Sequence, residues 1–226
     1  MAQELAVLEH HLKGIRPGMD RLVLPIGASS DRIIQSILVA CERNAQLLAC
    51  TPVSVCQGAM SLAWFGLEAD GFSGQGYLLP FNDRNAGVKK AQAVIGVRGY
   101  NTIGARSGLT ITGGVVREGE PFEFELGTDA FVRHKPQASC FENRITEAWA
   151  CATSHGRPAA VAWMPIAEIL QIRDNSPGYK FGSDSPWKNP RFFPAMVEKT
   201  PRRRLARSLP MSAYQHAAAM ESLADI

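Results

Sequence analysis

Apolar residues recur at helical spacing in the first third of the chain. Over residues 31–48 they stand three or four positions apart, which predicts an amphipathic helix capped by Ser29 or Ser30. A second helix is predicted from residue 52, because a threonine followed by a proline suits its start and a glycine suits its end. Residues 1–28 become rich in Gly and Pro towards their end and are interpreted as an N-terminal arm.

In the middle of the chain apolar residues recur at every second position, and this alternation is typical of strands. Three pairs of strands are predicted: "QGYLLPF" and "AQAVIGV" around a basic loop, "LTITGGVVR" and "PFEFELG" around "EGEP", and "ITEAWACAT" and "PAAVAWM" across "SHGR". A short helix, "YNTIGARS", lies between the first two pairs and is stopped by Gly108. In "PFEFELG" two phenylalanines alternate with Glu123 and Glu125, so one side of that strand is apolar and the other is acidic.

The end of the chain is predicted to be helical again. One helix runs from Pro165 to about Ile172, and a basic helix starts at Thr200, which would cap it, with Pro201 in its first turn. The fold class is therefore α+β, a mainly antiparallel sheet of hairpins with N-terminal helices packed on it and a basic C-terminal helical segment. The expected division is an arm over 1–28, a single α+β core over 29–173 and a basic loop or helix tail over 174–226.

Charge is unevenly distributed, although the 226 residues carry a formal net charge of only +3. Residues 84–117 hold six basic side chains and no acid, and residues 173–207 hold nine basic side chains against three acids. Between them, residues 118–147 hold seven acids against three bases. If the two basic segments share one face, that face attracts a polyanion such as a nucleic acid.

The motifs of several catalytic and metal-binding sites are missing. The chain has no G-x-x-x-x-G-K-[ST] loop for nucleotide phosphates and no G-x-S-x-G turn for a nucleophile. The five histidines are scattered and the five cysteines have no C-x-x-C spacing, so neither set indicates a metal site. His134 is interpreted as a structural hydrogen-bonding residue, and Glu123 and Glu125 as the exposed side of a strand. We therefore expect no catalytic residue and no metal ligand.

The expected location follows from the same composition. The N-terminus lacks the basic start and unbroken apolar stretch of a secretory signal, and no window reaches the 18 apolar residues of a membrane span. The odd number of cysteines is typical of buried, reduced thiols. We therefore expect a cytoplasmic protein with no membrane partner.

The basic and aromatic side chains indicate binding of a nucleic acid. Lysine and arginine neutralise phosphates, and aromatic rings stack on bases. Tyr77 and Tyr100 flank the basic loop and are candidates for stacking, whereas Trp149 and Trp163 are interpreted as core residues. Two other functions stay open, a nuclease and a sequence-specific regulator that uses the two N-terminal helices as a helix-turn-helix. The second of those helices offers little besides Gln57 to read a groove.

Four blocks of sequence resemble the RecT family of phage and prophage single-strand annealing proteins. They are "SLAWFGLEAD", "GQGYLLPF", "QAVIGVRGYNTIGARSG" and "MVEKTPRRRLARSLP". They follow one another in the family's order and cover most of the chain from about residue 30 to residue 210. Val97 stands where the family commonly has an aromatic residue, and Pro201 interrupts a segment that is usually free to be helical.

The resemblance implies ATP-independent binding of single-stranded DNA and annealing of complementary strands in homologous recombination. The protein would act as an oligomeric ring or helical filament, in the bacterial cytoplasm, with no catalytic residue and no required cofactor; a role for Mg2+ with the DNA is left open. Its partners would be single-stranded DNA, the annealing duplex intermediate and further copies of itself. A phage exonuclease and a host single-strand-binding protein are further candidate partners.

The resemblance also implies a set of DNA-binding residues. The family's basic positions correspond here to Lys89, Arg98, Arg106, Lys199, Arg203 and Arg204. The neighbouring Lys90, Gln92, Tyr100, Arg202 and Arg207 complete the predicted set. These residues would grip phosphates and leave the bases free to pair.

Overall fold

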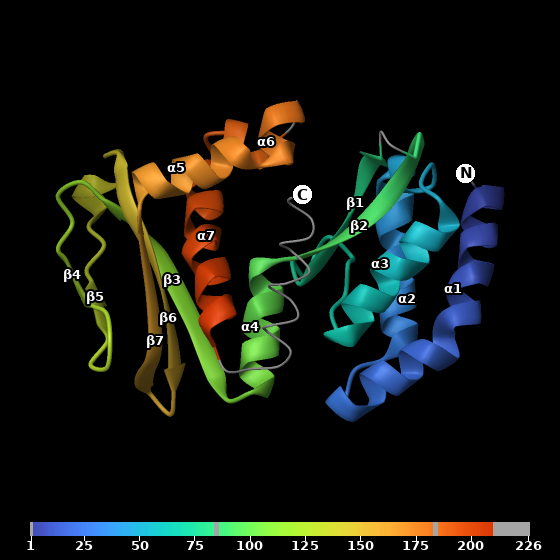
Figure 1. Ribbon diagram of the computed structural model, residues 1–226, viewed down its shortest axis with the longest axis horizontal. Helices are drawn as coiled ribbons and strands as arrows, with labels where there is room; N and C mark the ends of the chain where they lie inside the picture. The colour runs from blue at the N-terminus through green and yellow to red at the C-terminus, as the bar shows by residue number, and fades with distance from the viewer. Residues whose placement is uncertain (1, 84–85, 183–184, 210–226) are drawn as a thin grey trace. The chain divides into compact units, whose positions relative to one another are not determined.

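The computed structural model describes residues 2–83, 86–182 and 185–209, and it divides into two compact units (Figure 1). The first unit is Met1–Thr102 and the second is Ile103–Ile226. The boundary falls inside a helix, α4 (Val97–Arg106).

The first unit is helical, with one β-hairpin. Its elements are α1 (Ala2–Val23), the short 3-10 helix η1 (Leu24–Ile26), α2 (Ser30–Arg43), η2 (Ala45–Leu47), α3 (Pro52–Trp64), β1 (Gly76–Asp83), β2 (Val88–Ile95) and the start of α4. The hairpin and two helices are present where they were predicted, but the first helix ends at Arg43 and is followed by η2 instead of reaching residue 48, and the Thr51 side chain makes no capping hydrogen bond to α3. Ser29 caps α2 by accepting a hydrogen bond from the Arg32 N–H, as its position before the apolar stripe predicts.

Helix α1 occupies the segment for which the sequence indicated an arm. Its buried side chains, Leu8, Leu12, Met19 and Val23, are spaced as one helical stripe and pack against α2 and α3. Pro17 lies inside the helix on the exposed side, where the N–H that it lacks costs one backbone hydrogen bond. The buried stripe offsets that cost, so the Gly and Pro residues do not prevent helix formation.

The hairpin β1–β2 lies on α3 (Figure 1). Its strands pair in antiparallel register from Gly76 opposite Ile95 to Asp83 opposite Val88. Leu78 points towards α3 and is buried over Gly58, whose lack of a side chain makes room for it. One face of the hairpin is thus fixed on the helical layer, and the other face is the outer face, formed by Tyr77, Leu79, Phe81, Lys90, Gln92 and Val94.

The described part of the second unit contains two separate sheets. Its elements are β3 (Leu109–Arg117), β4 (Phe122–Glu125), β5 (Phe131–His134), η3 (Ala138–Cys140), β6 (Ile145–Ser154), β7 (Arg157–Pro165), α5 (Ile166–Asn175), α6 (Pro177–Phe181), η4 (Pro186–Lys188) and α7 (Phe193–Ser208). The main sheet has the order β3-β6-β7 and is antiparallel, and β4 pairs only with β5. The predicted strands "LTITGGVVR" and "PFEFELG" therefore exist but belong to different sheets.

Helix α7 packs on one face of the main sheet and the β4–β5 hairpin on the other (Figure 1). The buried alanines Ala148, Ala150 and Ala152 line the α7 side of β6. On the opposite side Trp149 and Trp163 are half-buried cross-strand neighbours, and Phe124 stacks on Trp163 with 4.7 Å between ring centroids. The tryptophans interpreted as core residues thus lie under the hairpin rather than under the helix.

The predicted start of the last helix at Thr200 is wrong. Helix α7 begins at Phe193, with a proline in its first turn, and continues through Pro201. The Thr200 side chain is not a cap, because its hydroxyl donates to the Met196 carbonyl at 3.0 Å within the helix. Val197, Leu205 and Ala206 are buried on the sheet, and this packing outweighs the N–H that Pro201 lacks.

The five cysteines are free thiols. Cys41, Cys50, Cys140 and Cys151 are buried, and Cys56 is half-buried. Within the described residues no single helix has the length and apolar composition of a membrane span; α1 with η1, and α2, pass that test only when taken together across a bend of 117°.

Gly99→Ala is expected to destabilise the first unit. A Cβ atom at Gly99 would lie 2.2 Å from the backbone oxygen of Gln75, so the backbone must shift, at about 1–3 kcal/mol of unfolding free energy. Gly14→Ala in α1 is the matched control, because nothing lies within 4 Å of its Cβ position. It should stabilise the protein by up to about 1 kcal/mol. Urea unfolding measures both, and equal stability of the two variants would contradict the close approach.

Candidate nucleic-acid interface

The junction between β2 and α4 is built on close backbone contacts. The Gly96 N–H donates to the Gln75 carbonyl at 2.8 Å, and a Cβ at Gly96 would lie 2.1 Å from the Gly74 carbonyl oxygen. Gly99, one helical turn further, meets the Gln75 carbonyl in the same way. The glycines of "VIGVRGY" therefore let the first turn of α4 lie against the 74–75 loop, and Arg98 stands between them.

Arg98 is exposed beside the outer face of the hairpin. Its Nη1 donates to the Ser73 carbonyl at 3.4 Å, a long contact that leaves most of the guanidinium accessible. The Cβ position of Gly74 lies 3.3 Å from Arg98 Cδ and 3.5 Å from the Tyr77 hydroxyl oxygen. The side chains of Arg98 and Tyr77 therefore both lie next to Gly74.

Lys89 and Lys90 point to opposite sides of the hairpin. Lys90 lies on the outer face opposite Phe81, and its Nζ is 2.7 Å from an oxygen of Asp83. Lys89 lies on the side that meets the helices, where its carbonyl accepts a hydrogen bond from the Thr51 N–H at 3.0 Å. The structure therefore places Lys90 beside Gln92 and separates Lys89 from them.

Helix α4 holds two further residues of the predicted set. Tyr100 is 0% exposed, so its ring is buried in the core of the described residues. Arg106 is exposed at the last position of the helix, and partial burial lowers the pKa of its guanidinium below the ordinary value. Arg106 stays charged at neutral pH, because an arginine pKa lies so far above 7.

The cations of α7 differ in their surroundings. Arg202 is 8% exposed, pairs with Glu198 and donates to the Gly113 carbonyl at 3.4 Å. Arg204 is exposed and pairs with Glu168 of α5. Lys199 and Arg203 are half-buried, and the side chain of Arg207 lies outside the described residues. Among the described side chains of the helix, Arg202 is thus built into the fold, Arg203 is half-buried and Arg204 lies at the surface.

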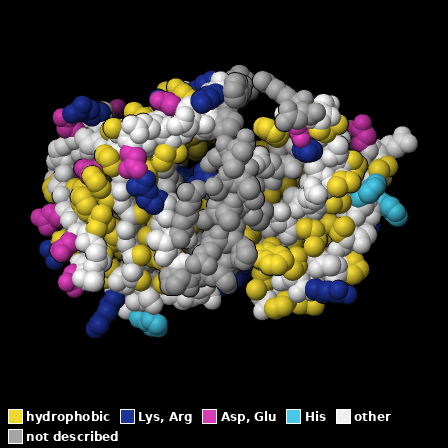
Figure 2. Space-filling view, viewed as in Figure 1, with side chains coloured by type: hydrophobic (Ala, Val, Ile, Leu, Met, Phe, Trp, Pro, Cys, Tyr) yellow, Lys and Arg dark blue, Asp and Glu magenta, His cyan; other side chains and the backbone are white. Residues whose placement is uncertain are grey.

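Leu79 and Phe81 continue the row that Tyr77 begins along β1, although only Tyr77 was predicted from the sequence as a stacking residue. The signal was the alternation in "GYLLPF", where Leu78 and Pro80 take the helix side. Acidic side chains gather elsewhere, at the edge of the second unit formed by β4 and β5, as Figure 2 shows. Glu123 and Glu125 are exposed there, as the alternating pattern predicted.

Comparison with known proteins decides the family. The model of the RecT family matches residues 31–224. Protein RecT of Escherichia coli (strain K12) is 31% identical over 193 residues, which are 84% of this chain and 70% of that protein. The chain belongs to the RecT family. It is therefore a DNA recombination protein of the single-strand annealing kind, and the resemblance stated from the four sequence blocks is confirmed.

Within this RecT-family chain, α3 is poorly placed to act as a recognition helix. It packs between α1 and the hairpin strand β2. Among its exposed side chains, which include Val53, Gln57 and Trp64, none is basic. A helix that enters a major groove needs polar or basic side chains on its free face.

A buried polar chain holds the β4–β5 hairpin on the main sheet. Trp149 Nε1–H donates to Nδ1 of His134 at 3.2 Å, and Nε2 of His134 lies 3.0 Å from a carboxylate oxygen of Glu120. The His134 and Glu120 side chains are each only 4% exposed. Because Nδ1 accepts, Nε2 carries the proton and donates to Glu120. His134 is thus a structural residue, as the sequence analysis expected.

Glu120→Gln is expected to weaken the fold at neutral pH but not in acid. Burial alone raises the pKa of Glu120, but the Arg117 and Gln137 N–H groups and His134 hold that pKa below its ordinary value of 4.5. A lowered folded-state pKa adds stability above about pH 4.5, which is lost as the pH falls through the folded value. The variant should lose about 1–3 kcal/mol at pH 7. Thermal unfolding at pH 7 and 3.5 measures this; a difference that is constant over pH would contradict it.

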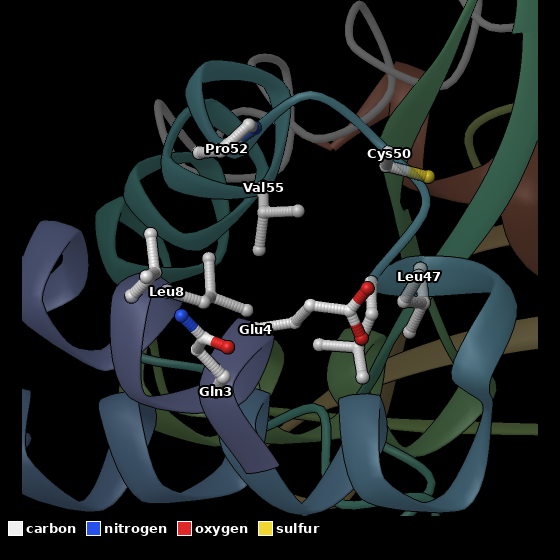
Figure 3. Close-up of a pocket in the computed structure, with 9 residues that line it drawn as sticks. Gln3, Glu4, Leu8, Leu47, Cys50, Pro52 and Val55 are labelled. Atoms are coloured by element: carbon white, nitrogen blue, oxygen red, sulfur yellow. The ribbon is translucent and has the colours of Figure 1, made fainter. Parts of the chain in front are cut away.

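A cavity of about 320 Å³ lies in the first unit between the starts of α1 and α3 and the η2 segment (Figure 3). Leu8, Leu47, Pro52 and Val55 give it a mostly apolar lining, and the Glu4 side chain extends between Leu8 and Leu47. None of the described residues that line it is a cation. It therefore offers no ligand for a phosphate, and the outer face of the hairpin is the better candidate interface.

Proposed function

We propose that this chain binds single-stranded DNA without ATP and anneals complementary strands as an oligomeric ring or filament. The observation that carries the proposal is the outer face of the hairpin, where Lys90 and Gln92 lie in one row and Arg98 stands at the end of the neighbouring row. Membership in a family of annealing proteins supports it. Arg106, Lys199, Arg203 and Arg204 of the second unit are the further phosphate ligands that we propose.

Three of the predicted DNA-binding residues are not part of this proposal. The Tyr100 ring is enclosed by the protein, and the Arg202 guanidinium is paired within the fold. Lys89 lies on the side of the hairpin that meets the helices. Tyr100 and Arg202 would need a change of structure before they could touch DNA, whereas Lys89 is half-buried on a different face from the proposed interface.

The proposed mechanism needs no bond to be made or broken. Two complementary strands repel each other through their phosphates, and fixed cations remove that repulsion while the bases remain free to test partners. Pairing then supplies the driving force, on the order of 1–2 kcal/mol for each base-pair step. The protein is indifferent to sequence, no nucleotide cofactor takes part, and its place of action is the cytoplasm. An exonuclease that produces single strands and a host single-strand-binding protein are the proposed partners.

Energy transfer between two labelled complementary oligonucleotides tests the proposal. The purified protein, without nucleotide, should accelerate pairing of complementary strands of arbitrary sequence and leave a non-complementary pair unchanged. If about five phosphates are neutralised per subunit, the logarithm of the affinity should fall against the logarithm of the salt concentration with a slope of roughly −3 to −4. Binding that prefers one duplex sequence, or a flat salt response, would overturn the proposal.

A further inference from the structure

The outer face of the β1–β2 hairpin exposes a row of large apolar side chains. Tyr77, Leu79 and Phe81 are 39%, 48% and 50% exposed, although the other face of the same strand is packed on α3. Single exposed apolar residues are common on soluble proteins, but a continuous row of this size usually marks a binding surface. The row therefore calls for a partner with flat apolar surfaces.

The charges around this row favour a nucleic acid. Arg98 stands at the Tyr77 end, where both residues border Gly74, and Lys90 stands directly opposite Phe81 in the strand register. The carboxylate of Asp83, the acidic residue on this side of the hairpin, is paired with Lys90. Arg98 at one end of the row, and at the other end a half-exposed Lys90 whose charge is shared with Asp83, suit a ligand that carries rings and anions together.

The spacing of the row fits an unpaired strand better than a duplex. Alternate residues on a strand lie about 6.8 Å apart, which is twice the rise of about 3.4 Å between stacked bases. A single strand can be drawn out so that its bases match this spacing and its ring faces are free. In a duplex those faces are already covered by neighbouring base pairs.

We infer that Tyr77 and Phe81 stack on the bases of single-stranded DNA while Arg98 and Lys90 hold its phosphates. The inference rests on the proposed function and assigns base-binding residues to the same site. Leu79 fills the space between the two rings, and Gln92, opposite Leu79, lies beside the bases. Stacking uses the faces of a base and leaves its pairing edge free, so a base held on the row still recognises its complement.

The row also gives a physical reason for product release. Each base on an aromatic ring gives up its stacking on a neighbouring base. When a complementary strand pairs, the duplex restores base-on-base stacking and removes the faces on which Tyr77 and Phe81 act. The site therefore favours the unpaired substrate over the annealed product.

The inference is tested by removing the aromatic rings from the protein and, separately, the bases from the DNA, and by comparing the two effects on affinity. The variant Tyr77→Ala/Phe81→Ala is compared with the wild-type chain by fluorescence anisotropy at one salt concentration. The two probes are an oligothymidine and an abasic oligonucleotide of equal length, which has the phosphates but no bases. On the oligothymidine each lost ring should weaken binding by about 5- to 100-fold. On the abasic strand the variant and the wild type should differ by less than about 2-fold, and the salt slope should not change.

Two matched variants separate stacking from other roles. Phe81→Tyr keeps the ring and should keep the affinity, whereas Phe81→Leu keeps the apolar surface without the ring and should lose it. Phe141→Ala removes an exposed aromatic residue of the second unit and should leave both probes unaffected. The thermal midpoint of each variant should stay close to that of the wild type, since these side chains are exposed.

Three results would overturn the inference. Equal losses on both probes would mean that the rings support the phosphate ligands, and no loss on either would mean that bases do not touch the row. A change in sedimentation with unchanged affinity would mean that the row binds another copy of the chain. In all three cases annealing by the wild-type protein would still stand, and a wild type that binds neither probe would instead reject the proposed function itself.

Discussion

Arg98→Glu should weaken binding of single-stranded DNA by at least about tenfold while leaving the fold intact. The guanidinium is exposed and makes one long hydrogen bond, to the Ser73 carbonyl at 3.4 Å. Replacing it therefore removes little from the folded state. A carboxylate at the same point beside Tyr77 would repel the phosphates that the arginine is proposed to attract.

The control for Arg98→Glu is Arg21→Glu, which changes the net charge by the same amount. Arg21 is exposed in the last turn of α1 and does not belong to the outer face of the hairpin. Anisotropy titrations at several salt concentrations measure the difference. The milder variant Arg98→Gln should reduce the salt slope by about 0.7 for one lost phosphate. Equal losses for the Arg21 and Arg98 reversals would show that only total charge matters, and an unfolded Arg98 variant would make this arginine structural.

Arg202→Ala, unlike Arg98→Glu, should cause a large loss of stability in the second unit. The Arg202 side chain is 9% exposed, pairs with Glu198 one turn earlier and donates to the Gly113 carbonyl. Its Nε lies 2.9 Å from the Cβ position of Gly113, so its stem packs directly on β3. Removing it leaves Glu198 without this partner and opens a gap against the sheet, at about 2–4 kcal/mol of unfolding free energy.

Urea unfolding of Arg202→Ala and Arg204→Ala measures this contrast on one helix. The Arg204–Glu168 pair is more exposed, so Arg204→Ala should cost no more than about 1 kcal/mol. The double variant Arg202→Ala/Glu198→Ala should recover part of the loss, because no carboxylate is then left unpaired. A fully stable Arg202→Ala protein that no longer binds DNA would contradict the structural role and return Arg202 to the proposed interface.

Local sequence rules predicted the elements that depend on neighbouring residues. The cap at Ser29, the apolar stripe of α2 and the alternation in β1 are all local, and each is present. Helix α1 was missed because Pro17 and two nearby glycines outweighed the buried stripe that begins at Leu8. That stripe has helical spacing, so the signal was in the sequence.

Pairings between strands that lie far apart in the sequence were harder to predict from local patterns. Nothing in "LTITGGVVR" indicates that its partner is β6, about thirty residues on, rather than β4, because strand pairing is set by packing on both sides of the sheet. The candidate interface shows the same limit. The opposite directions of Lys89 and Lys90 follow from the period of a strand, and the pairing of Arg202 with Glu198 follows from a spacing of four in a helix. The enclosure of Tyr100 depends on tertiary contacts that no local pattern contains.

We expect the natural cysteines to react slowly with thiol-directed reagents, because four of them are buried and Cys56 is half-buried. Burial raises the pKa of Cys41 to about 11, with smaller contributions from Cys50 and Glu42, and burial also raises the thiol pKa of Cys50, Cys56 and Cys151. Only the thiolate attacks a maleimide or a disulfide, and these four thiols hold little of it at pH 7. A single cysteine introduced at the exposed Ala86, in the turn of the hairpin, would therefore react ahead of them. A fluorophore could be attached there without removing any natural cysteine, and its signal would test whether DNA strands reach the outer face.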